Sequence, residues 1–348
     1  MRKILVTGGS GFIGSNFVHY WIKRHPEDRI INLDALTYAG NPENLRVVED
    51  HPTYRFVHGN IQDSILVEQL FAEEAVEIVV HFAAESHVDR SILGPDAFIQ
   101  TNVNGTFALL QAALKYWKTN TDDHRFLHVS TDEVYGSLKP KAPAFTEQHR
   151  YAPNSPYSAS KAAADHLARA YWKTYQLPVL ISNCSNNYGP YQFPEKLIPL
   201  VILNALENRP IPVYGDGNNI RDWLFVEDHC SGLAAVIEKG RVGGVYNIGG
   251  SNEWRNIDIV NLICDRLDVL VPAAKPRREL ITFVQDRPGH DRRYAIDSSR
   301  IQRELGWRPA HDFSTGIDST LRWYLDNRDW CDRVRSGEYQ RYYDRMYG

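Results

Sequence analysis

Thr7-Gly8-Gly9-Ser10-Gly11-Phe12-Ile13-Gly14 is the stretch of sequence that decides the fold. It follows Lys3–Thr7, an apolar run of strand length, and it leads into a helical pattern at Phe12–Arg24. Glycine lets a backbone turn tightly and lets another group approach it closely. A strand, a glycine-rich turn and a helix in this order predict the first βαβ unit of an open parallel sheet.

The same alternation of strand-length and helix-length patterns continues through the first half of the chain. We expect further strands at Arg29–Leu33, Tyr54–His58, Ile78–Phe82, Arg125–Ser130 and Val179–Cys184, and further helices at Ile65–Glu73, Thr101–Trp117 and Tyr157–Tyr175. This rhythm predicts the α/β class, with a Rossmann-type, doubly wound parallel sheet.

An acidic residue stands where such a sheet binds a ribose. Asp34 closes the second expected strand, 20 residues after Gly14. A carboxylate there accepts hydrogen bonds from ribose hydroxyls and repels a 2′-phosphate, while the glycines let a pyrophosphate approach the helix N-terminus. No arginine immediately follows Asp34. The pattern predicts NAD rather than NADP, and the alternative is a glycine turn with a surface aspartate.

The second half of the chain has a different composition. After about residue 185, Pro- and Gly-rich loops predict a smaller, irregular lobe. Trp223–Glu238 and Val245–Ile248 then predict a helix and a strand that return to the first lobe. We expect an NAD-binding Rossmann domain at 1–184 and 222–249, and a smaller α/β substrate domain at 185–221 and 250–348, ending in a docked tail at Ser336–Gly348.

Composition excludes several classes of protein. The 348 residues carry a formal charge of -4 and are 43% hydrophobic, which is ordinary globular composition. The absence of a basic run argues against a nucleic-acid surface, and no apolar run approaches the roughly 18 residues of a membrane span. Scattered cysteines predict reduced, structural thiols in the cytoplasm: Cys184, Cys230, Cys264 and Cys331. No metal site is expected, because His81 and His87 have no ligand partners at a suitable spacing.

Thr131, Asp132 and Glu133 directly follow the expected strand Arg125–Ser130. The C-terminal end of a strand in an open α/β sheet faces the ligand crevice. Neighbouring side chains on an extended segment point to opposite sides, so two carboxyls can serve different atoms of one substrate as acid and base. The alternative is a solvated turn with an acidic N-cap.

Tyr157 and Lys161 are four residues apart at the start of an expected helix, so they share one helix face. An ammonium favours the phenolate, and bringing a tyrosine pKa from about 10 to near neutrality requires roughly 4 kcal/mol. The positive nicotinamide ring of NAD would supply part of this stabilisation. Tyr135 and Lys139 have the same spacing, but that segment contains a glycine and runs into Pro140. We interpret it as a loop.

These motifs resemble those of the extended short-chain dehydrogenase/reductase family and, within it, the nucleotide-sugar 4,6-dehydratases. The resemblance covers essentially the whole chain, and it is carried by Leu36–Asn41, Ala83–Ser91, Ser130–Gly136, Asn186–Pro190 and Arg221–His229. Asp132 and Glu133 distinguish the dehydratases from related enzymes. Epimerases of this fold usually lack both acids, and decarboxylases typically keep only the glutamate. An epimerase or decarboxylase is the alternative enzyme, and a cofactor-sensing protein without catalysis is the alternative of another class.

The resemblance implies a lyase that dehydrates a nucleotide-diphosphate glucose to a 4-keto-6-deoxy sugar. Thr131 would hydrogen-bond the sugar 4-hydroxyl, Tyr157 beside Lys161 would take its proton, and NAD would take the C4 hydride and return it to C6. Glu133 would remove the C5 proton while protonated Asp132 delivers a proton to the departing 6-hydroxyl. The resemblance does not decide between thymidine and uridine in the substrate nucleotide, because one methyl group changes the binding free energy by only about 1 to 3 kcal/mol.

Two sets of binding residues follow from the resemblance. The cofactor set is Gly8, Gly11, Phe12, Ile13, Gly14, Asp34, Leu36, Thr37, Asn60, Ile61, Phe82, Ala83, Ala84, Ser86, Thr101, Tyr157, Lys161 and Asn187. The family usually has aspartate in place of Asn60, so we expect weaker but intact adenine recognition. The substrate set is Ser86, Thr131, Asn186, Glu195, Lys196, Leu197, Tyr214, Arg221, Asn256, Arg287, His290 and Tyr294. Its arginines suit a diphosphate because their forked donors match phosphate oxygens.

Two of the expected helices carry small residues beside larger ones. They are Ala112, Ala113, Ala162, Ala163 and Ala164, beside Phe107, Leu110, Leu167 and Tyr171. Such faces can pack closely against their own copy, and the resemblance implies a homodimer through a four-helix bundle. Burial inside the monomer would produce the same pattern.

Overall fold

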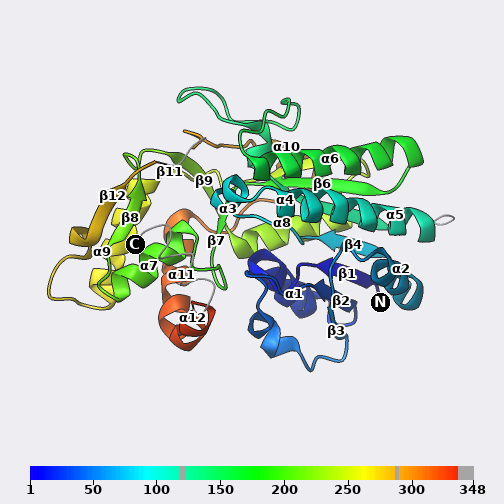
Figure 1. The fold of residues 1–348 in the computed structure, drawn as a ribbon, viewed down its shortest axis with the longest axis horizontal. Helices are drawn as coiled ribbons and strands as arrows, with labels where there is room; N and C mark the ends of the chain where they lie inside the picture. The colour runs from blue at the N-terminus through cyan, green and yellow to red at the C-terminus, as the bar shows by residue number, and fades with distance from the viewer. Residues whose placement is uncertain (118–122, 287–289, 336–348) are drawn as a thin grey trace.

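A computed structural model describes residues 1–117, 123–286 and 290–335. Its centre is a seven-stranded, wholly parallel sheet in the order β10-β6-β5-β4-β1-β2-β3 (Figure 1). The strands are β1 (Lys3–Thr7), β2 (Arg29–Asp34), β3 (Tyr54–His58), β4 (Ile78–His81), β5 (Arg125–Thr131), β6 (Val179–Cys184) and β10 (Val245–Ile248). The order runs outward in both directions from β1 and β4, which makes the sheet doubly wound.

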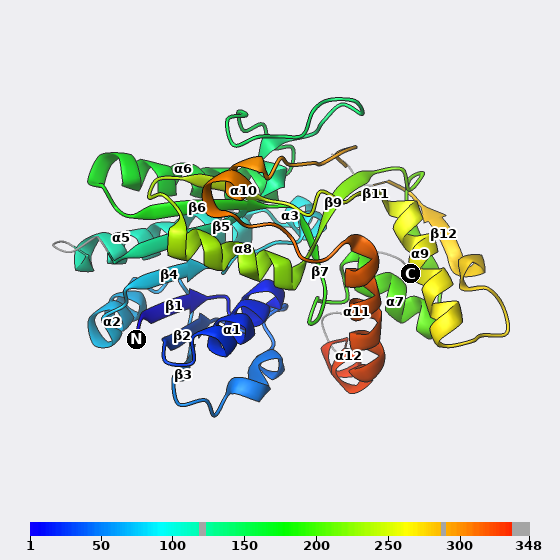
Figure 2. The same cartoon turned by 180° about the vertical axis from the view of Figure 1, so that it is seen from behind.

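Helices cover both faces of this sheet (Figures 1 and 2). One face packs on α1 (Phe12–Arg24), α8 (Val226–Lys239) and α10 (Ser299–Leu305), and the other on α2 (Ser64–Glu74), α5 (Thr106–Tyr116) and α6 (Pro156–Tyr175). Successive residues of a strand point to opposite faces of the sheet. Ile4 and Val6 of β1 pack in the core with α1, α8 and α10, and Leu5 packs in the core with α2, α5 and α6. The expected Rossmann-type sheet is confirmed.

The second lobe holds more regular structure than its loop-rich sequence suggested. A three-stranded sheet has the order β11 (Glu253–Arg255), β9 (Ile220–Phe225), β7 (Asn186–Tyr188), and β8 (Ile211–Tyr214) pairs with β12 (Ile281–Val284). Around them pack α7 (Leu197–Leu206), α9 (Asn256–Leu270), η4 (Arg277–Leu280), α11 (Phe313–Asp326) and α12 (Arg328–Val334).

Short elements make up the loops between the main strands. They are η1 (Pro42–Val48) after β2, α3 (Val88–Leu93) and α4 (Asp96–Phe98) after β4, and η3 (Asp132–Tyr135) after β5. A π-helical stretch, Ile99–Gly105, precedes α5, so the expected helix Thr101–Trp117 is α-helical only from Thr106. Among the described residues, no helix combines the length and the apolar character that crossing a membrane requires.

Two expectations about the second half of the chain were wrong. Trp223, Leu224 and Phe225 belong to β9, where they pair with β7, and the helix begins only at Val226. A short apolar run fits a strand and a buried helix equally well by its pattern. In addition, α10 lies beyond residue 250 and yet packs in the first lobe, where Ile301 and Leu305 join the core under β10. The expected tail Ser336–Gly348 lies outside the described residues.

Candidate active site

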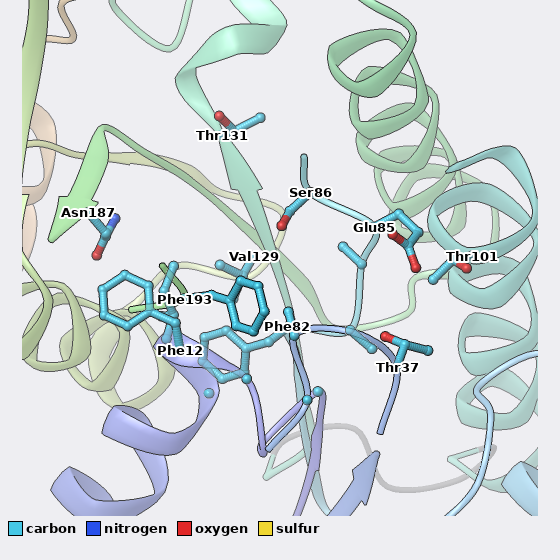
Figure 3. Close-up of a pocket in the computed structure, with 18 of the residues that line it drawn as sticks. Phe12, Thr37, Phe82, Glu85, Ser86, Thr101, Val129, Thr131, Asn187 and Phe193 are labelled. Carbon is cyan, nitrogen blue, oxygen red and sulfur yellow. The ribbon is translucent and has the colours of Figure 1, made fainter. Parts of the chain in front are cut away.

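The C-terminal ends of β1, β2, β4, β5 and β6 surround a cavity of about 320 Å³. We call it the first cavity. Figure 3 shows Phe12, Phe82 and Phe193 gathered on one side of it and Thr37 and Thr101 on the other. This is the edge at which open α/β sheets bind their ligands.

The glycine turn forms a floor that a ligand can approach closely. Gly8 has a φ of +70°, and a Cβ there would lie 2.6 Å from the Ala83 nitrogen. A Cβ on Gly14 would lie 2.2 Å from the Gly8 oxygen. Both positions therefore require glycine, and the turn leaves its backbone bare at the N-terminus of α1, where a pyrophosphate is stabilised.

Asp34 is fixed by the backbone on both sides. Its Oδ2 accepts from the Ser10 amide at 2.9 Å, and its Oδ1 accepts from the Leu36 amide at 2.8 Å. Burial raises the pKa of Asp34, and these two hydrogen bonds oppose that rise. A carboxylate accepts about four hydrogen bonds, so each oxygen keeps capacity for a ribose hydroxyl.

The structure brings the expected cofactor residues together. All of them line the first cavity except Leu36, which contributes its amide to Asp34 from a backbone φ of 50°. Asn60 is at the cavity wall, and its Oδ1 accepts from the Gln62 amide at 2.9 Å. The residue set therefore fits a dinucleotide, for which the glycine turn would receive the phosphates and Asp34 the ribose.

The two acids lie on a 3₁₀ turn rather than on an extended segment. Thr131 ends β5 and caps η3, where its Oγ1 accepts from the Glu133 amide at 3.3 Å. Three residues make one turn of this helix, so neighbouring side chains still point in different directions. Asp132 is 2% exposed and lines only the first cavity, whereas Glu133 is half-buried and lines a second cavity as well.

The surroundings of Asp132 favour the protonated form of its carboxyl. Burial raises the pKa of this carboxyl well above its ordinary value, and the nearby charges of Glu133 and Asp222 raise it further. Arg221 and the Thr131 hydroxyl act in the opposite direction without cancelling the rise. Desolvation disfavours the charged form of an acid, so a buried aspartic acid beside another carboxyl is a proton donor.

Tyr157 and Lys161 occupy the first turns of α6. Ser155 caps this helix in a reciprocal pair with Ser158, which explains why the helix begins here. The Lys161 Nζ donates to the Val129 carbonyl at 2.8 Å, and both side chains line the first cavity. Tyr135 is buried at the end of η3, whereas Lys139 is exposed in the loop that follows, so this second pair does not share a helix face.

The protein's own groups do not lower the pKa of Tyr157 as the sequence suggested. Burial and the charges of Glu133 and Cys184 raise it well above 10, against a hydrogen bond from Thr131. Burial also lowers the pKa of Lys161. The ammonium alone therefore does not produce a phenolate, and a further positive charge in the cavity is required.

A second cavity, of about 180 Å³, adjoins the first between the two lobes. Ser86, Glu133, Asn186, Glu195 and Lys196 line both. The expected substrate residues Ser86, Asn186, Glu195, Lys196, Leu197, Tyr214, Arg221, Asn256 and His290 line the second cavity, and Thr131 lines the first. The Tyr294 ring lies under Arg221, with 4.4 Å from the guanidinium carbon to the ring centre. Arg287 lies outside the described residues.

Arg221 is a rigidly held cation. Its side chain is buried, and it donates to the carbonyl oxygens of Ile220 at 2.8 Å and Asp291 at 2.9 Å. His290, another lining residue of this cavity, contacts Asp286, with 2.5 Å between the His290 Nδ1 and the Asp286 Oδ1. Burial raises the pKa of Glu195 to about 7, although Lys196 and Arg90 oppose the rise. The second cavity thus combines a fixed cation with polar groups, which suits an anionic ligand.

Sequence reasoning missed several lining residues. Glu85, Val129, Cys184, Gln192 and Phe193 line the first cavity. Most of them directly adjoin quoted motifs, so extending each motif by a few residues would have found them. All four cysteines are free and buried, as expected, although Cys184 reaches the cavity. His81 bonds Thr7 at 2.7 Å and Thr106 at 2.9 Å, which confirms a buried, hydrogen-bonded histidine.

The chain belongs to the GDP-mannose 4,6 dehydratase family, whose model matches residues 5–320. Among its relatives is the dTDP-glucose 4,6-dehydratase of Shigella flexneri, 55% identical over 357 residues and 99% of both chains. That of Xanthomonas campestris pv. campestris strain B100 is 58% identical over 346 residues and 98% of both chains.

Solved structures of such enzymes share the fold. The dTDP-glucose 4,6-dehydratase from Bacillus anthracis in complex with NAD has a TM-score of 0.86 and 50% identity, and the comparison covers 96% of this chain and 100% of that chain. DesIV, a dTDP-glucose 4,6-dehydratase from Streptomyces venezuelae with NAD bound, has a TM-score of 0.88 and 47% identity over the same shares.

We predict that Asp132→Asn stabilises the cofactor-free protein at higher pH. The unfolded aspartate ionises near pH 4. The folded group has a raised pKa, so its stability contribution is complete below about pH 4 and is lost as pH rises towards the folded pKa. Asparagine has no such loss. Thermal unfolding at pH 5 and pH 8 should therefore show a melting-temperature advantage for Asp132→Asn that grows with pH.

Asp50→Asn is the matched control, because Asp50 is exposed. It should give the same difference from the parent protein at both pH values. An Asp132→Asn difference that stays constant or shrinks between pH 5 and pH 8 would contradict a buried, protonated Asp132.

Proposed function

We propose that this chain is a lyase that dehydrates dTDP-glucose to dTDP-4-keto-6-deoxyglucose. The observation that carries the proposal is the burial of Asp132, which raises the pKa of its carboxyl, next to Glu133 at the sheet edge, with Tyr157 and Lys161 in the same cavity. Relatives that are 55% identical over 99% of the chain are dTDP-glucose 4,6-dehydratases. An elimination requires one acid and one base in place together, and the two neighbouring carboxyls can supply both.

The chain binds NAD, as its structural neighbours do. The glycine turn receives the pyrophosphate, and Asp34 receives the adenosine ribose. NAD, when bound there, would supply the acceptor for the C4 hydride and the donor of that hydride to C6, so the cofactor would end each cycle as it began. Its cationic ring would supply the positive charge that favours a Tyr157 phenolate.

The side chains divide the proton transfers among them. Thr131 and Tyr157 hold the sugar 4-hydroxyl, and Tyr157 takes its proton. Oxidation at C4 acidifies C5, from which Glu133 removes a proton. Asp132 gives its own proton to the departing 6-hydroxyl, which leaves as water, and Glu133 afterwards returns a proton to C5. The burial of Asp132 supports its part as the acid, because only a protonated carboxyl can donate.

The second cavity would hold the nucleotide part of the substrate. Arg221 is already fixed by two carbonyl oxygens and by the Tyr294 ring, so little side-chain entropy is lost when a diphosphate binds. Glu133, Asn186 and Lys196 line both cavities and would meet the sugar at the junction. We propose the division into an NAD-binding lobe and a nucleotide-sugar lobe on this basis, with α10 assigned to the first.

Incubation with dTDP-glucose tests the activity. We expect mass spectrometry to show a product lighter by one water. An unchanged mass with inverted C4 would instead identify an epimerase. Bound NAD without turnover would identify a cofactor-sensing protein, and either outcome would contradict the dehydratase.

We predict that Glu133→Gln separates oxidation from elimination. Tyr157 and Lys161 are intact in this variant, so C4 oxidation should proceed, but the amide cannot remove the C5 proton. The absorbance of reduced nicotinamide should accumulate to about one equivalent per site, and product release should fall by about 10² to 10⁴. Product release at the parent rate would show that Glu133 is not the base.

We propose a homodimer through the α5 and α6 side of the molecule. Most of the small residues expected at that interface are buried inside the monomer: Ala112, Ala113, Ala162 and Ala164, with Leu110 and Tyr171. The exposed apolar side chains lie nearby, on α3, the π-helical stretch and α5: Ile92, Leu93, Ile99 and Phe107. A cluster of this kind is typical of a protein interface. The four free cysteines support a cytoplasmic location.

Phe107→Asp tests the dimer. Phe107 is 45% exposed in the monomer, so an aspartate costs little there but places two charges in a symmetric interface. Analytical ultracentrifugation should give a dimer for the parent chain and a monomer for this variant. Phe283→Asp is the control, because Phe283 is 58% exposed on β12 of the other lobe and should leave the dimer intact. A monomeric parent chain would refute the dimer.

A further inference from the structure

The loop between β2 and β3 forms one wall of the first cavity. Thr37, Ala39 and Gly40 of this loop line the cavity close to Asp34. The loop then continues into η1, which packs on α1 beside the glycine turn. Residues 35–48, which we call the adenosine loop, therefore cover the part of the cavity assigned to the adenosine half of NAD.

Asn44 of η1 is the point at which the adenosine loop meets two other parts of the chain. Its side chain is 2% exposed. Its Nδ2 donates to the Ser10 carbonyl at 2.9 Å, and its Oδ1 accepts from the Trp330 indole at 2.9 Å. An indole N–H can only donate and a carbonyl can only accept, so this amide has a single satisfactory orientation.

The chain of contacts continues from Ser10 to the ribose site. The Ser10 carbonyl accepts from the Asn41 amide at 3.0 Å as well as from Asn44, and the Ser10 amide donates to Asp34 Oδ2 at 2.9 Å. Both backbone polar groups of Ser10 are thus occupied. Hydrogen bonds therefore link Trp330 to Asn44, Asn44 to the Ser10 carbonyl, and the Ser10 amide to Asp34, the residue expected to bind the ribose.

Trp330 reaches Asn44 from the far end of the chain. It lies on α12, which Figures 1 and 2 show below the second lobe, facing the segment that holds η1. Its buried ring packs against Tyr191, Trp323 and Tyr324, so its position is set by the second-lobe core. The lobe that would bind the nucleotide sugar therefore contacts the adenosine loop through a buried hydrogen bond.

We propose that Trp330 is a positioning residue for cofactor retention, with α12 acting as a latch on the adenosine loop. This inference rests on the proposed use of NAD as a resident cofactor. Such a cofactor must stay bound through many turnovers, so a contact that slows its release serves the reaction. Trp330 acts through Asn44 and Ser10 and touches neither NAD nor sugar.

Trp330→Phe tests the latch, because it keeps an aromatic ring but leaves the buried Asn44 oxygen without its donor. We expect labelled NAD, after dilution into excess unlabelled NAD, to leave this variant about tenfold faster or more. Turnover at saturating NAD should stay unchanged. In dilute assays without added NAD, turnover should fall and added NAD should restore it, which a purely structural defect would not allow.

Two neighbouring residues supply matched controls. Arg333 also lies on α12 and also contacts η1, through Glu43 at 2.8 Å, but this ion pair is exposed to solvent. Arg333→Ala should therefore change NAD release by about twofold or less. Trp323→Phe keeps an aromatic ring against Trp330 and Tyr191 and leaves the bond from Trp330 to Asn44 in place, so NAD release should stay near that of the parent chain.

Asn44→Asp changes the residue between Trp330 and Ser10 in this set of hydrogen bonds and leaves Trp330 intact. A carboxylate keeps the acceptor for the indole but loses the donor to the Ser10 carbonyl, so NAD release should again accelerate. NAD release at the parent rate in both Trp330→Phe and Asn44→Asp would overturn the latch while leaving the proposed dehydratase standing. A parent chain that retains no labelled NAD would instead overturn the resident cofactor and the latch with it.

Discussion

The active site depends on the burial of one carboxyl group beside another. Asp132 lies at the end of a central strand, and its side chain is withdrawn from water while Glu133 reaches into both cavities. Two neighbouring acids in a poorly solvated site do not ionise equally, and the pKa of the more buried one is raised. Adjacent residues of the same chemical type are thereby suited to act as a proton donor and as a base. Burial raises the pKa of Tyr157 as well, and an added positive charge in the cavity would oppose that rise.

The parallel sheet explains why groups from distant parts of the sequence meet at this point. The ends of β1 and β2 supply the glycine turn and Asp34, and the ends of β4, β5 and β6 supply the other walls of the first cavity. The second lobe adds Arg221 and its neighbours across the junction. The same lobe returns through α12 to support the cofactor loop. If both proposals hold, sugar binding and cofactor retention share one structural unit.

Local patterns in the sequence were sufficient for the first lobe. Strands β1, β3 and β6 and helix α1 have the bounds expected from their apolar runs and flanking glycines, because these signals lie within a few residues. Tertiary pairing decided the rest: Trp223–Phe225 became a strand against β7, and α10 joined the first core. The Thr131 side chain caps the segment that holds Asp132 and Glu133, which forms a 3₁₀ turn instead of the expected extended segment. The bond between Asn44 and Trp330 spans 286 residues, and no local pattern could have indicated it.

Infrared difference spectroscopy on the cofactor-free protein tests the protonation of Asp132 most directly. The spectrum of Asp132→Asn would be subtracted from that of the parent chain at neutral pH, which removes the signals of Asp165 and Glu195, two other buried acids with raised pKa values. The structure predicts that the difference contains the carbonyl band of a protonated carboxylic acid. A difference that contains only the bands of an ionised carboxylate would contradict the account.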